Sequence, residues 1–541
     1  MNVTFRCILD KIFTIMTYLT ALLIVILLLI VLSPMLWKGT SAVIFRETIE
    51  FRKMQLALFN RGSEAGLVAE TAQTAALRQT VYETLDRFKS GIDTESLIGQ
   101  VKDVYRQFGE QLRSRELPRE EFTSLRSLTK DIRDRLETAF TSSDRTEVIA
   151  CLDYAAKFSN DPGLKNTYAE NFFKIASNYR KNIENIDLDR LHQNAKDVRG
   201  VEELIVLLLG PRPGTPLPST AMNQFGATRM DMAEQILDKL LYKEQWVEQG
   251  PGLPLVRVRT ERAKQFAGTE LEPMFGFIKN NINHILRPQW RFYWQYFIDG
   301  STPGHYFGGV GPEILGTLLL TVISMLFAAP IGIIAAAYLT ECASDNVVIK
   351  IIRMCINTLA GVPSIVFGLF GLAFFVLFFL PLIGLPSRPC IIAASMTLTI
   401  LTLPVMIRAS EEAIRSVPHT YKEASLAMGA GTFKTFISVT LPAAMPGILT
   451  GIILSISRVA GETAPVLFTG AVALGPVPSS VLQQTRTLSY GSYDMAVSDR
   501  ISSMVPHNQY GMVATLVVLI LCLNIAAIIL RSRVFKKLHG H

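Results

Sequence analysis

The sequence predicts an all-α integral membrane protein in which six bilayer-spanning helices carry a large, mostly helical insertion outside the cytoplasm. Three observations predict this fold. Of the 541 residues, 49% are hydrophobic, a proportion typical of membrane proteins. Six apolar runs have the length of about 20 residues that a helix needs to cross a bilayer. A long polar segment separates the first run from the other five, so the chain divides into residues 1–37, 38–310 and 311–541.

The first apolar run, residues 18–37, reads YLTALLIVILLLIVLSPMLW. A cleavable signal peptide is the competing interpretation, but the run is long for such a segment and no A-x-A site follows it. We therefore expect a retained spanning helix. Five further spans are expected over residues 312–340, 356–382, 389–409, 446–471 and 511–531.

Basic residues in the short connections mark one side of the membrane. They precede the first span, lie between the second and third and between the fourth and fifth, and follow the sixth: Arg6, Lys11, Lys350, Arg353, Arg415, Lys422, Lys434, Arg531, Arg533, Lys536 and Lys537. By the positive-inside rule this side is cytoplasmic. Both termini are then expected in the cytoplasm, and residues 38–310 outside it.

The net charge of +7 has the same origin. Residues 311–541 hold 14 Lys and Arg against 9 Asp and Glu, whereas residues 38–310 are nearly balanced, with 37 against 36. Because the basic excess lies in the hydrophobic parts, it reflects membrane topology and argues against nucleic-acid binding.

The insertion begins with amphipathic helices. Apolar residues recur at intervals of three and four in three segments: Leu77, Val81, Leu85 and Phe88; Leu97, Val101, Val104, Phe108 and Leu112; Leu125, Leu128, Ile132, Leu136 and Phe140. Gly91, Pro118 and residues 142–144 interrupt these segments, so we expect a small bundle or hairpin of antiparallel helices. Residues 210–220 resemble a linker into a less regular part with one short strand at 253–258. We expect a structural or docking module without chemistry.

Catalytic signatures are absent from the sequence. It contains no Gly-Lys pair, hence no Walker A phosphate cradle, and it has no HExxH, GxSxG or kinase signature. Its six cysteines are scattered without the spacing of a disulfide framework or metal site. We therefore expect a protein that is not an enzyme in its own right and binds no metal or cofactor itself.

The loop at residues 410–445 carries a recognisable motif. Glu423, Ala424, Ser425, Gly429, Val439, Leu441 and Pro442 fit the pattern E-A-A-x3-G-x9-I-x-L-P with two conservative departures, Ser425 and Val439. Small residues allow a short helix to pack into a groove, Gly429 permits a sharp turn, and Pro442 is expected to restart the chain toward the next span. An ordinary amphipathic loop helix is the competing interpretation.

This motif resembles the cytoplasmic signature of ABC importer permeases. The resemblance implies the six-helix core of a type I importer, with a coupling helix that docks on a separate ATPase subunit, where ATP and Mg²⁺ bind. The stretch SRVAGETAPVLFTG at 457–470 is similar to the PstA type of phosphate importer permease. That resemblance implies a bacterial inner membrane, a second permease of the PstC type, two ATPase subunits and a periplasmic phosphate-binding protein.

The residues of the fifth span also indicate an anion path. A continuous helix would place Gly451, Ser455, Arg458, Glu462, Pro465 and Thr469 on one small and polar stripe. Arg458 lies 12 residues beyond Pro446, about 18 Å, near the midplane. Its planar guanidinium suits a tetrahedral oxyanion, and Glu462 can neutralise it at rest. The competing interpretation is an ion pair that only ties helices together.

Other residues of the core receive weaker assignments. Thr463 belongs to the same signature as Arg458 and is placed with it on the substrate path. Arg408, near the cytoplasmic end of the fourth span, is either a path residue or a snorkelling arginine. Four residues of the third span are expected to allow close helix packing: Gly361, Pro363, Ser364 and Gly368.

Two alternatives to a phosphate importer remain open from the sequence. A permease of the same superfamily could carry another oxyanion, such as molybdate or sulfate. A membrane receptor with a sensing insertion would need a signalling domain after a span, and only 11 residues follow Leu530.

Overall fold

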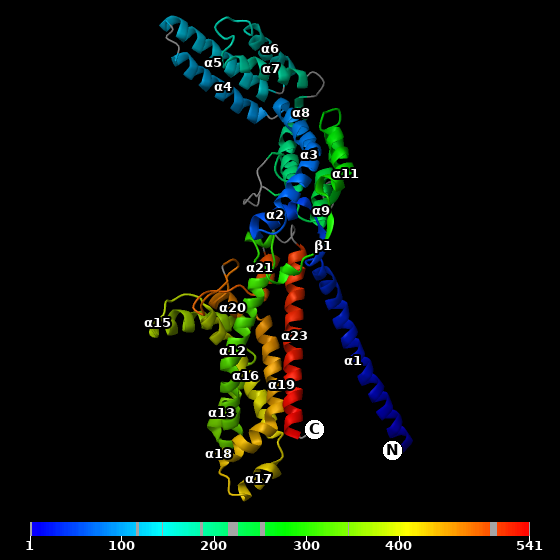
Figure 1. Ribbon diagram of the computed structural model, residues 1–541, viewed down its shortest axis with the longest axis vertical. Coiled ribbons are helices and arrows are strands. Elements are labelled where there is room, and N and C mark those ends of the chain that lie inside the picture. The colour runs from blue at the N-terminus through cyan, green and yellow to red at the C-terminus, as the bar shows by residue number, and fades with distance from the viewer. Residues whose placement is uncertain are drawn as a thin grey trace. The chain divides into compact units, whose positions relative to one another are not determined.

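The computed structural model describes residues 3–92, 94–114, 118–142, 144–183, 188–214, 225–248, 255–344, 346–475, 477–497 and 506–539. The chain forms two compact units, which we call unit 1 (Met1–Ile44 and Phe292–His541) and unit 2 (Phe45–Arg291). The expected insertion, residues 38–310, contains unit 2 together with short flanking segments of unit 1 (Figure 1). Each unit is described by itself.

Unit 1 is a helical bundle. Among the described residues, six helices are long and apolar enough to cross a membrane: Lys11–Thr40, Gly311–Cys342, Ser364–Leu382, Ile391–Arg415, Thr432–Gly461 and Pro506–Lys536. They correspond to α1 (Val3–Thr40), α12 (Gly311–Ala337), α14 (Ser364–Gly371), α16 (Ile391–Arg415), α19 (Leu441–Gly461) and α23 (Pro506–His539), some extended by π-helical turns (Figure 1). The predicted all-α membrane fold is confirmed.

Helix α16 is the centre of this bundle. Two-thirds of its most apolar window is buried, whereas no residue in the corresponding windows of α1 and α23 is buried within the chain. Small residues let α19 approach α16 closely, since a Cβ added at Gly451 would lie 2.6 Å from the Cβ of Ala409. Dense interiors leave no room for such an atom, so this glycine fixes the spacing of the two helices.

The third span begins later than the sequence predicts. Residues 347–359 form a separate amphipathic helix, α13 (Val347–Leu359), and the spanning helix starts at Ser364 after a turn. Pro363 is the residue before the new helix, where its ring disfavours helical backbone at Val362. The prediction of one continuous span from 356 is therefore wrong, because apolarity continues across a backbone break.

The fifth span also differs from the prediction at both ends. Its helix begins at Thr432 with α18 (Thr432–Thr435), passes through the π-helical segment η6 (Phe436–Thr440) and continues as α19. Pro442 lies inside this helical run and does not restart the chain, contrary to the prediction. A proline removes one N–H and crowds the preceding turn, and the wider π turn just before it relieves that conflict.

Short elements complete unit 1. They are η2 (Trp294–Phe297), η3 (Pro303–His305), η4 (Tyr338–Cys342), η5 (Leu372–Phe379), α15 (Leu380–Leu382), α17 (His419–Ala427), α20 (Ala464–Thr469) and α21 (Leu488–Val497). Helix α20 packs on α14, and α21 packs on α12 and α23.

Unit 2 is mostly helical, and its helices are α2 (Ile49–Phe59), α3 (Glu64–Ile92), α4 (Thr94–Ser114), α5 (Arg119–Thr141), α6 (Arg145–Lys157), α7 (Glu170–Ile183), α8 (Leu188–Leu209), α9 (Met230–Leu241), α10 (Arg262–Gln265) and α11 (Glu272–Leu286). The three helical segments predicted before residue 142 are confirmed as α3, α4 and α5. Most of their predicted stripe residues are buried.

Two small sheets accompany these helices. Strands β2 (Tyr242–Glu248) and β3 (Leu255–Glu261) form an antiparallel hairpin, and β1 (Ile44–Glu47) pairs with β4 (Gln289–Phe292). The predicted strand at 253–258 overlaps β3 from Leu255 on, while 253 and 254 lie outside the described residues. Strand β2 was not predicted because its sequence, YKEQWVE, lies on the surface and lacks an apolar alternation.

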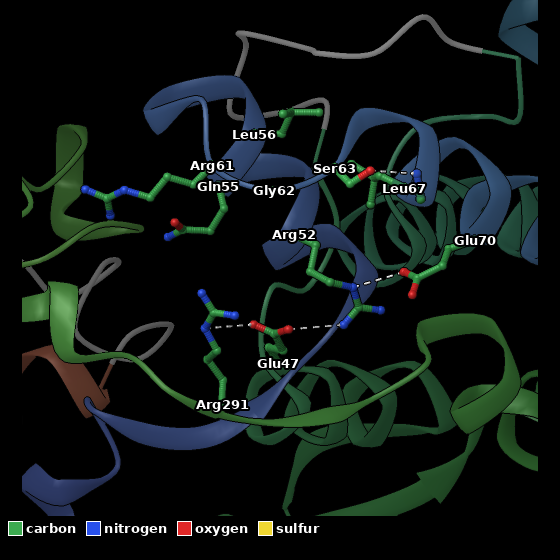
Figure 2. Close-up of a pocket in the computed structure, with 11 residues that line it drawn as sticks. Glu47, Arg52, Gln55, Leu56, Arg61, Gly62, Ser63, Leu67, Glu70 and Arg291 are labelled. Atoms are coloured by element: carbon green, nitrogen blue, oxygen red, sulfur yellow. Dashed lines mark hydrogen bonds and ion pairs between the residues drawn. The ribbon is translucent and has the colours of Figure 1, made fainter.

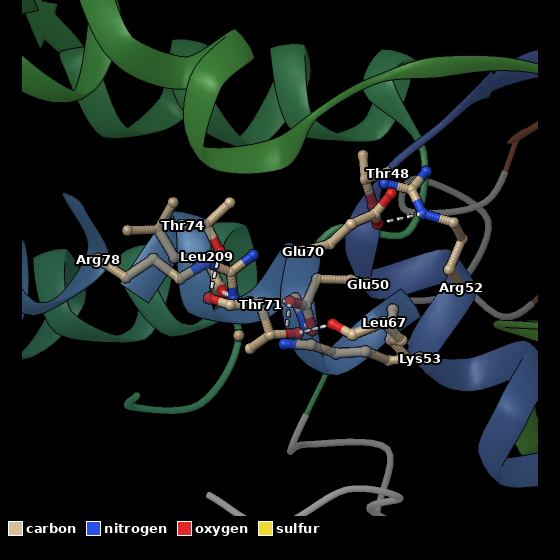
Figure 3. A network of polar contacts seen from close by, with 12 residues as sticks. Thr48, Glu50, Arg52, Lys53, Leu67, Glu70, Thr71, Thr74, Arg78 and Leu209 are labelled. Carbon is tan, nitrogen blue, oxygen red and sulfur yellow. Dashed lines mark hydrogen bonds and ion pairs between the residues drawn. The ribbon is translucent and has the colours of Figure 1, made fainter. Parts of the chain in front are cut away.

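A buried ionic network in unit 2 connects α2, α3 and the end of α8 (Figure 3). The Glu50 carboxylate on α2 accepts hydrogen bonds from Lys53, 2.8 Å away, and from Arg78 of α3, 2.7 Å away. Arg78 also donates to the carbonyl of Leu209 at the end of α8. All three charged side chains are buried, so the network replaces hydration with fixed partners.

Candidate functional site

Arg458 and Glu462 form an ion pair at the end of α19. The distance from Arg458 Nε to Glu462 Oε1 is 3.4 Å, with 35% of the arginine side chain and 19% of the glutamate side chain exposed. Glu462 is the residue that ends the helix, with extended backbone angles of φ −74° and ψ 128°. The pair therefore marks the point at which a spanning helix stops.

This helix end corrects the predicted continuous stripe. Pro465 and Thr469 belong to the separate short helix α20, so they do not continue the face of Gly451, Ser455 and Arg458. The signal for the break was present in the sequence, since Gly461 is followed four residues later by a proline that cannot donate into a continuing helix.

Neighbouring elements hold the break in place. Ser489 of α21 donates a hydrogen bond to the carbonyl of Glu462, 3.2 Å away. Ser457, beside Arg458, bonds to Asn524 of α23 at 2.8 Å. A Cβ added at Gly368 of α14 would lie 2.9 Å from the carbonyl oxygen of Ala464, so the start of α20 lies directly on α14.

The other two residues assigned with Arg458 lie on either side of it. Ser455 is fully buried one turn earlier on α19, and its hydroxyl has no hydrogen-bond partner among the described residues. Thr463 precedes α20, and its carbonyl accepts the backbone N–H of Leu467. The structure thus places Ser455, Arg458, Glu462 and Thr463 around one interruption of the fifth span.

Arg408 has a different environment. Its Nε donates to Oδ1 of Asn357 on α13, 2.7 Å away, and the side chain is exposed. The adjacent Ala409 lies level with Gly451, and Arg458 is seven residues further along α19, about 10 Å at 1.5 Å per residue. The structure does not bring Arg408 together with Arg458.

The motif of the loop at residues 410–445 forms a short helix and a turn. Glu423, Ala424 and Ser425 lie on α17, and none of its residues is buried. Gly429 follows with a φ of 84°, a left-handed conformation that L side chains rarely adopt, so the expected sharp turn is present. Two contacts hold α17 in place: Lys422 pairs with Glu341 of η4, and the hydroxyls of Ser425 and Thr435 lie 3.0 Å apart.

This loop presents apolar side chains to its surroundings. Tyr421, Leu426, Met428 and Phe433 are all exposed, Met428 by 89%. Leu441 and Pro442, the last residues of the motif, lie at the start of α19 and are partly buried. Tyr421 and Leu426 lie on α17, and Met428 and Phe433 follow it. Exposed large apolar residues that gather on one short segment are typical of an interaction site.

The four predicted packing residues divide into two groups. Gly368 lies inside α14 and allows the close approach of α20 described above. Gly361 and Pro363 lie in the turn before α14, and Ser364 is its first residue. At Gly361 the nearest atom to an added Cβ is the carbonyl oxygen of Thr358, 3.4 Å away in its own preceding turn, so its packing role stays a prediction.

Sequence reasoning missed a largely buried ion pair in unit 1. Arg486 Nη1 lies 3.4 Å from Glu313 Oε1, and both side chains are largely buried. Ser301 bridges them, accepting from Arg486 at 3.1 Å and donating to Glu313 at 3.2 Å. A glutamate at the start of an apolar run was a signal for Glu313. Nothing in the sequence around Arg486 distinguished it from other loop arginines.

A multi-pass helical bundle with charges at a broken span and an exposed loop helix is typical of the membrane subunit of a transport system. Residues 328–540 match the family model described as binding-protein-dependent transport system inner membrane component. The chain is 35% identical to the probable ABC transporter permease protein YqgI of Bacillus subtilis, over 43% of this chain and 80% of YqgI. The chain belongs to the family of ABC transporter permeases.

The chain is also similar to two further proteins. The chain is 39% identical to phosphate transport system permease protein PstA 1 of Mycobacterium tuberculosis over 34% of this chain, and it spans 57% of that relative. An inward-facing structure of the MetNI methionine ABC transporter aligns with 43% of this chain and 99% of its own, at 19% identity and a TM-score of 0.34.

Family membership settles the general role of the chain. It is a multi-pass protein of the inner membrane and a permease subunit, so it is not itself an enzyme. A permease of this family works with a partner ATPase and a binding protein.

Proposed function

We propose that this chain is the PstA-type permease subunit of an ATP-driven phosphate importer. The observation that carries the proposal is the Arg458–Glu462 pair at the broken end of α19, inside the signature that resembles PstA. The 39% identity to a mycobacterial PstA supports phosphate as the substrate. Molybdate or sulfate is the alternative, because the same guanidinium geometry suits any tetrahedral oxyanion.

Arg458 acts as the anion ligand in this proposal. One face of its guanidinium is engaged by Glu462 at 3.4 Å, longer than an ideal charge-assisted hydrogen bond, so the pair can open without a large loss. Phosphate would take the place of the glutamate and accept two parallel N–H bonds. Glu462 neutralises the arginine between transport cycles, since an uncompensated charge in a membrane span is costly. Ser455 and Thr463 offer hydroxyl groups on either side of this position. Arg408 joins this path only in another conformation.

The coupling part of the proposal rests on α17. The ATPase, which binds ATP and Mg²⁺, would dock on the exposed residues of this helix, and closure of its dimer would pull on α17. The contacts of α17 with η4 and α18 would pass that movement to α12 and α19. Glu423, Ala424, Ser425, Gly429, Leu441 and Pro442 form this connection.

The proposal also names the other subunits of the importer. A PstC-type permease, two ATPase subunits and a periplasmic phosphate-binding protein complete it. Both termini and α17 lie in the cytoplasm, and residues 38–310 lie in the periplasm as a module without chemistry of its own, apart from the inference below.

Phosphate uptake by charge variants tests the proposal. Arg458→Lys keeps the charge but loses the planar fork, so uptake should fall at least tenfold while the complex still assembles. The double variant Arg458→Gln with Glu462→Gln should assemble normally, because no charge remains uncompensated, and should not transport. Near-normal uptake by the double variant, normalised to assembled complex, would mean that the pair only ties helices together.

Competition between anions separates phosphate from its alternatives. Labelled phosphate uptake should be unaffected by an excess of molybdate or sulfate. If either anion competes better than unlabelled phosphate, the chain serves that oxyanion instead.

A further inference from the structure

A cavity of about 250 Å³ lies in unit 2, between α2, the first turns of α3 and Arg291 of β4 (Figure 2). We call it the α2–α3 cavity. Its wall is shaped by the turn between the two helices, where Asn60 has a φ of 51° and Gly62 a φ of 120°. Only glycine adopts the second of these angles readily, so this turn is built for a sharp reversal. The Ser63 hydroxyl then accepts the backbone N–H of Gly66 and fixes the start of α3.

A row of alternating charges lines the cavity. Arg52 is fully engaged: it donates to Glu70 at 3.0 Å, to Glu47 at 3.4 Å and to the carbonyl of Arg287 at 3.2 Å. Arg291 is held less tightly, because its Nε lies 3.7 Å from Glu47 Oε2, beyond hydrogen-bond distance. Glu47 therefore faces both Arg52 and Arg291 but is within hydrogen-bond distance of Arg52 alone.

The Glu47 carboxylate itself is only partly hydrogen-bonded. Its side chain is 5% exposed, and Oε2 has no hydrogen-bond partner among the described residues. Burial raises the pKa of Glu47, and this effect exceeds the lowering by Arg291 and Arg52. The carboxylate is thus poorly compensated, although a guanidinium stands nearby.

Gln55 supplies an independent sign of a missing partner. The residue is 3% exposed, and neither its side-chain nitrogen nor its side-chain oxygen has a hydrogen-bond partner among the described residues. Figure 2 shows its amide directed into the space between Arg61 and Arg291. Buried amides are almost always hydrogen-bonded, so a buried amide that opens onto a cavity indicates a ligand there.

We infer that the α2–α3 cavity binds a small molecule bearing an oxyanion group, either a phosphate or a carboxylate, through Arg291 and Gln55. The guanidinium supplies charge and two parallel donors, and the amide supplies a further donor. The cavity is large enough for inorganic phosphate or a short dicarboxylate. The site is separate from Arg458 and does not depend on the proposed transport path.

Binding to the full-length chain in lipid nanodiscs tests this inference. The Arg458→Gln background removes the anion ligand of the transport path, so remaining binding reports on unit 2 alone. Calorimetric titration with inorganic phosphate and, separately, with succinate identifies the source of the oxyanion. We expect saturable binding of one of the two at one site per chain.

Three variants in this background assign the site. Arg291→Gln and Gln55→Leu should each weaken binding at least tenfold. Glu47→Gln should tighten it several-fold, because the carboxylate that competes for Arg291 is gone, and a misfolded protein would not show such a gain. Arg257→Gln, which removes an exposed arginine of β3, is the matched control and should bind as the background does.

Two results would overturn the inference. One is the absence of binding of both probes, which would mean that the cavity holds water only. The other is binding that persists at full strength in Arg291→Gln and Gln55→Leu while the thermal unfolding midpoints match the background. Neither result would bear on the proposed role of Arg458, which is measured by uptake.

Discussion

The buried carboxylate of Glu50 shows how single residues organise unit 2. Besides Lys53 and Arg78, it accepts the backbone N–H of Gly226 at 3.2 Å. A Cβ added at Gly210 would lie 2.7 Å from Glu50 Oε2 and 2.9 Å from the nitrogen of Gly226, so the segment after α8 reaches the carboxylate only because it carries glycine there. Burial alone would raise the pKa of Glu50, but Arg78 and Lys53 lower it, which keeps the group ionised.

Removing one member of this network should destabilise unit 2. Arg78→Met leaves Glu50 with Lys53 alone, and breaking a buried ion pair in this way costs about 3–5 kcal/mol. Denaturant unfolding of the full chain, with proteolysis of unit 2 as the readout, measures this loss of stability. Arg106→Met removes an arginine of an exposed ion pair on α4 and serves as the control, with an expected effect within about 1 kcal/mol.

Low pH should also destabilise unit 2. The pKa of Glu50 is lower in the folded chain than in the unfolded one. Ionised Glu50 therefore stabilises the fold at pH values above its ordinary pKa of about 4.3, and this stabilisation is lost as the pH falls below that value. Arg78→Met should flatten this part of the stability profile. Equal acid sensitivity in both proteins would contradict the assignment of Glu50.

At the scale of elements, the sequence predicted spanning helices well and their interruptions poorly. Bilayer thickness dictates the length of an apolar run, so all six helices could be found. The backbone breaks at Pro363 and Glu462 fall within apolar sequence, where hydropathy carries no information about backbone direction. The Arg458–Glu462 pair was found because i and i+4 share a helix face, whereas Glu313 and Arg486 are 173 residues apart and meet only in the folded bundle.

The turn after α17 provides a test of the coupling helix. A Cβ at Gly429 meets no atom within 4 Å, so any effect of substitution comes from its φ of 84° and not from a clash. Gly429→Val should lower ATP-dependent uptake at least tenfold, because a β-branched residue strongly disfavours this conformation. Membrane insertion should be unchanged.

Gly429→Asn is the matched control for this turn. Asparagine tolerates left-handed backbone, so uptake should stay within about twofold of the parent. Full uptake by Gly429→Val would mean that the turn geometry does not contribute to coupling.

At the scale of the whole molecule, the distribution of basic residues predicts which side each part occupies. Two exposed positions report on opposite sides: Trp246 on β2 and Met428 after α17. In a cysteine-free background, Trp246→Cys should react with an impermeant maleimide on intact spheroplasts, and Met428→Cys only after the membrane is opened. The reverse pattern would invert the topology, including the proposed docking side of the ATPase.

The packing of α1 on α23 has a consequence for how the chain is made. A Cβ added at Gly39 would lie 2.5 Å from the Cβ of Ala514, so a helix near the start of the chain fits against one near its end. During synthesis α1 enters the bilayer long before its partner exists, and strand β1 likewise waits for β4 until all of unit 2 has left the ribosome. Membrane insertion of α1 must therefore be stable in lipid alone, as its apolar run at residues 18–37 allows. The contacts between α1 and α23 form only after α23 is inserted, so a chain truncated before residue 506 leaves α1 without this partner.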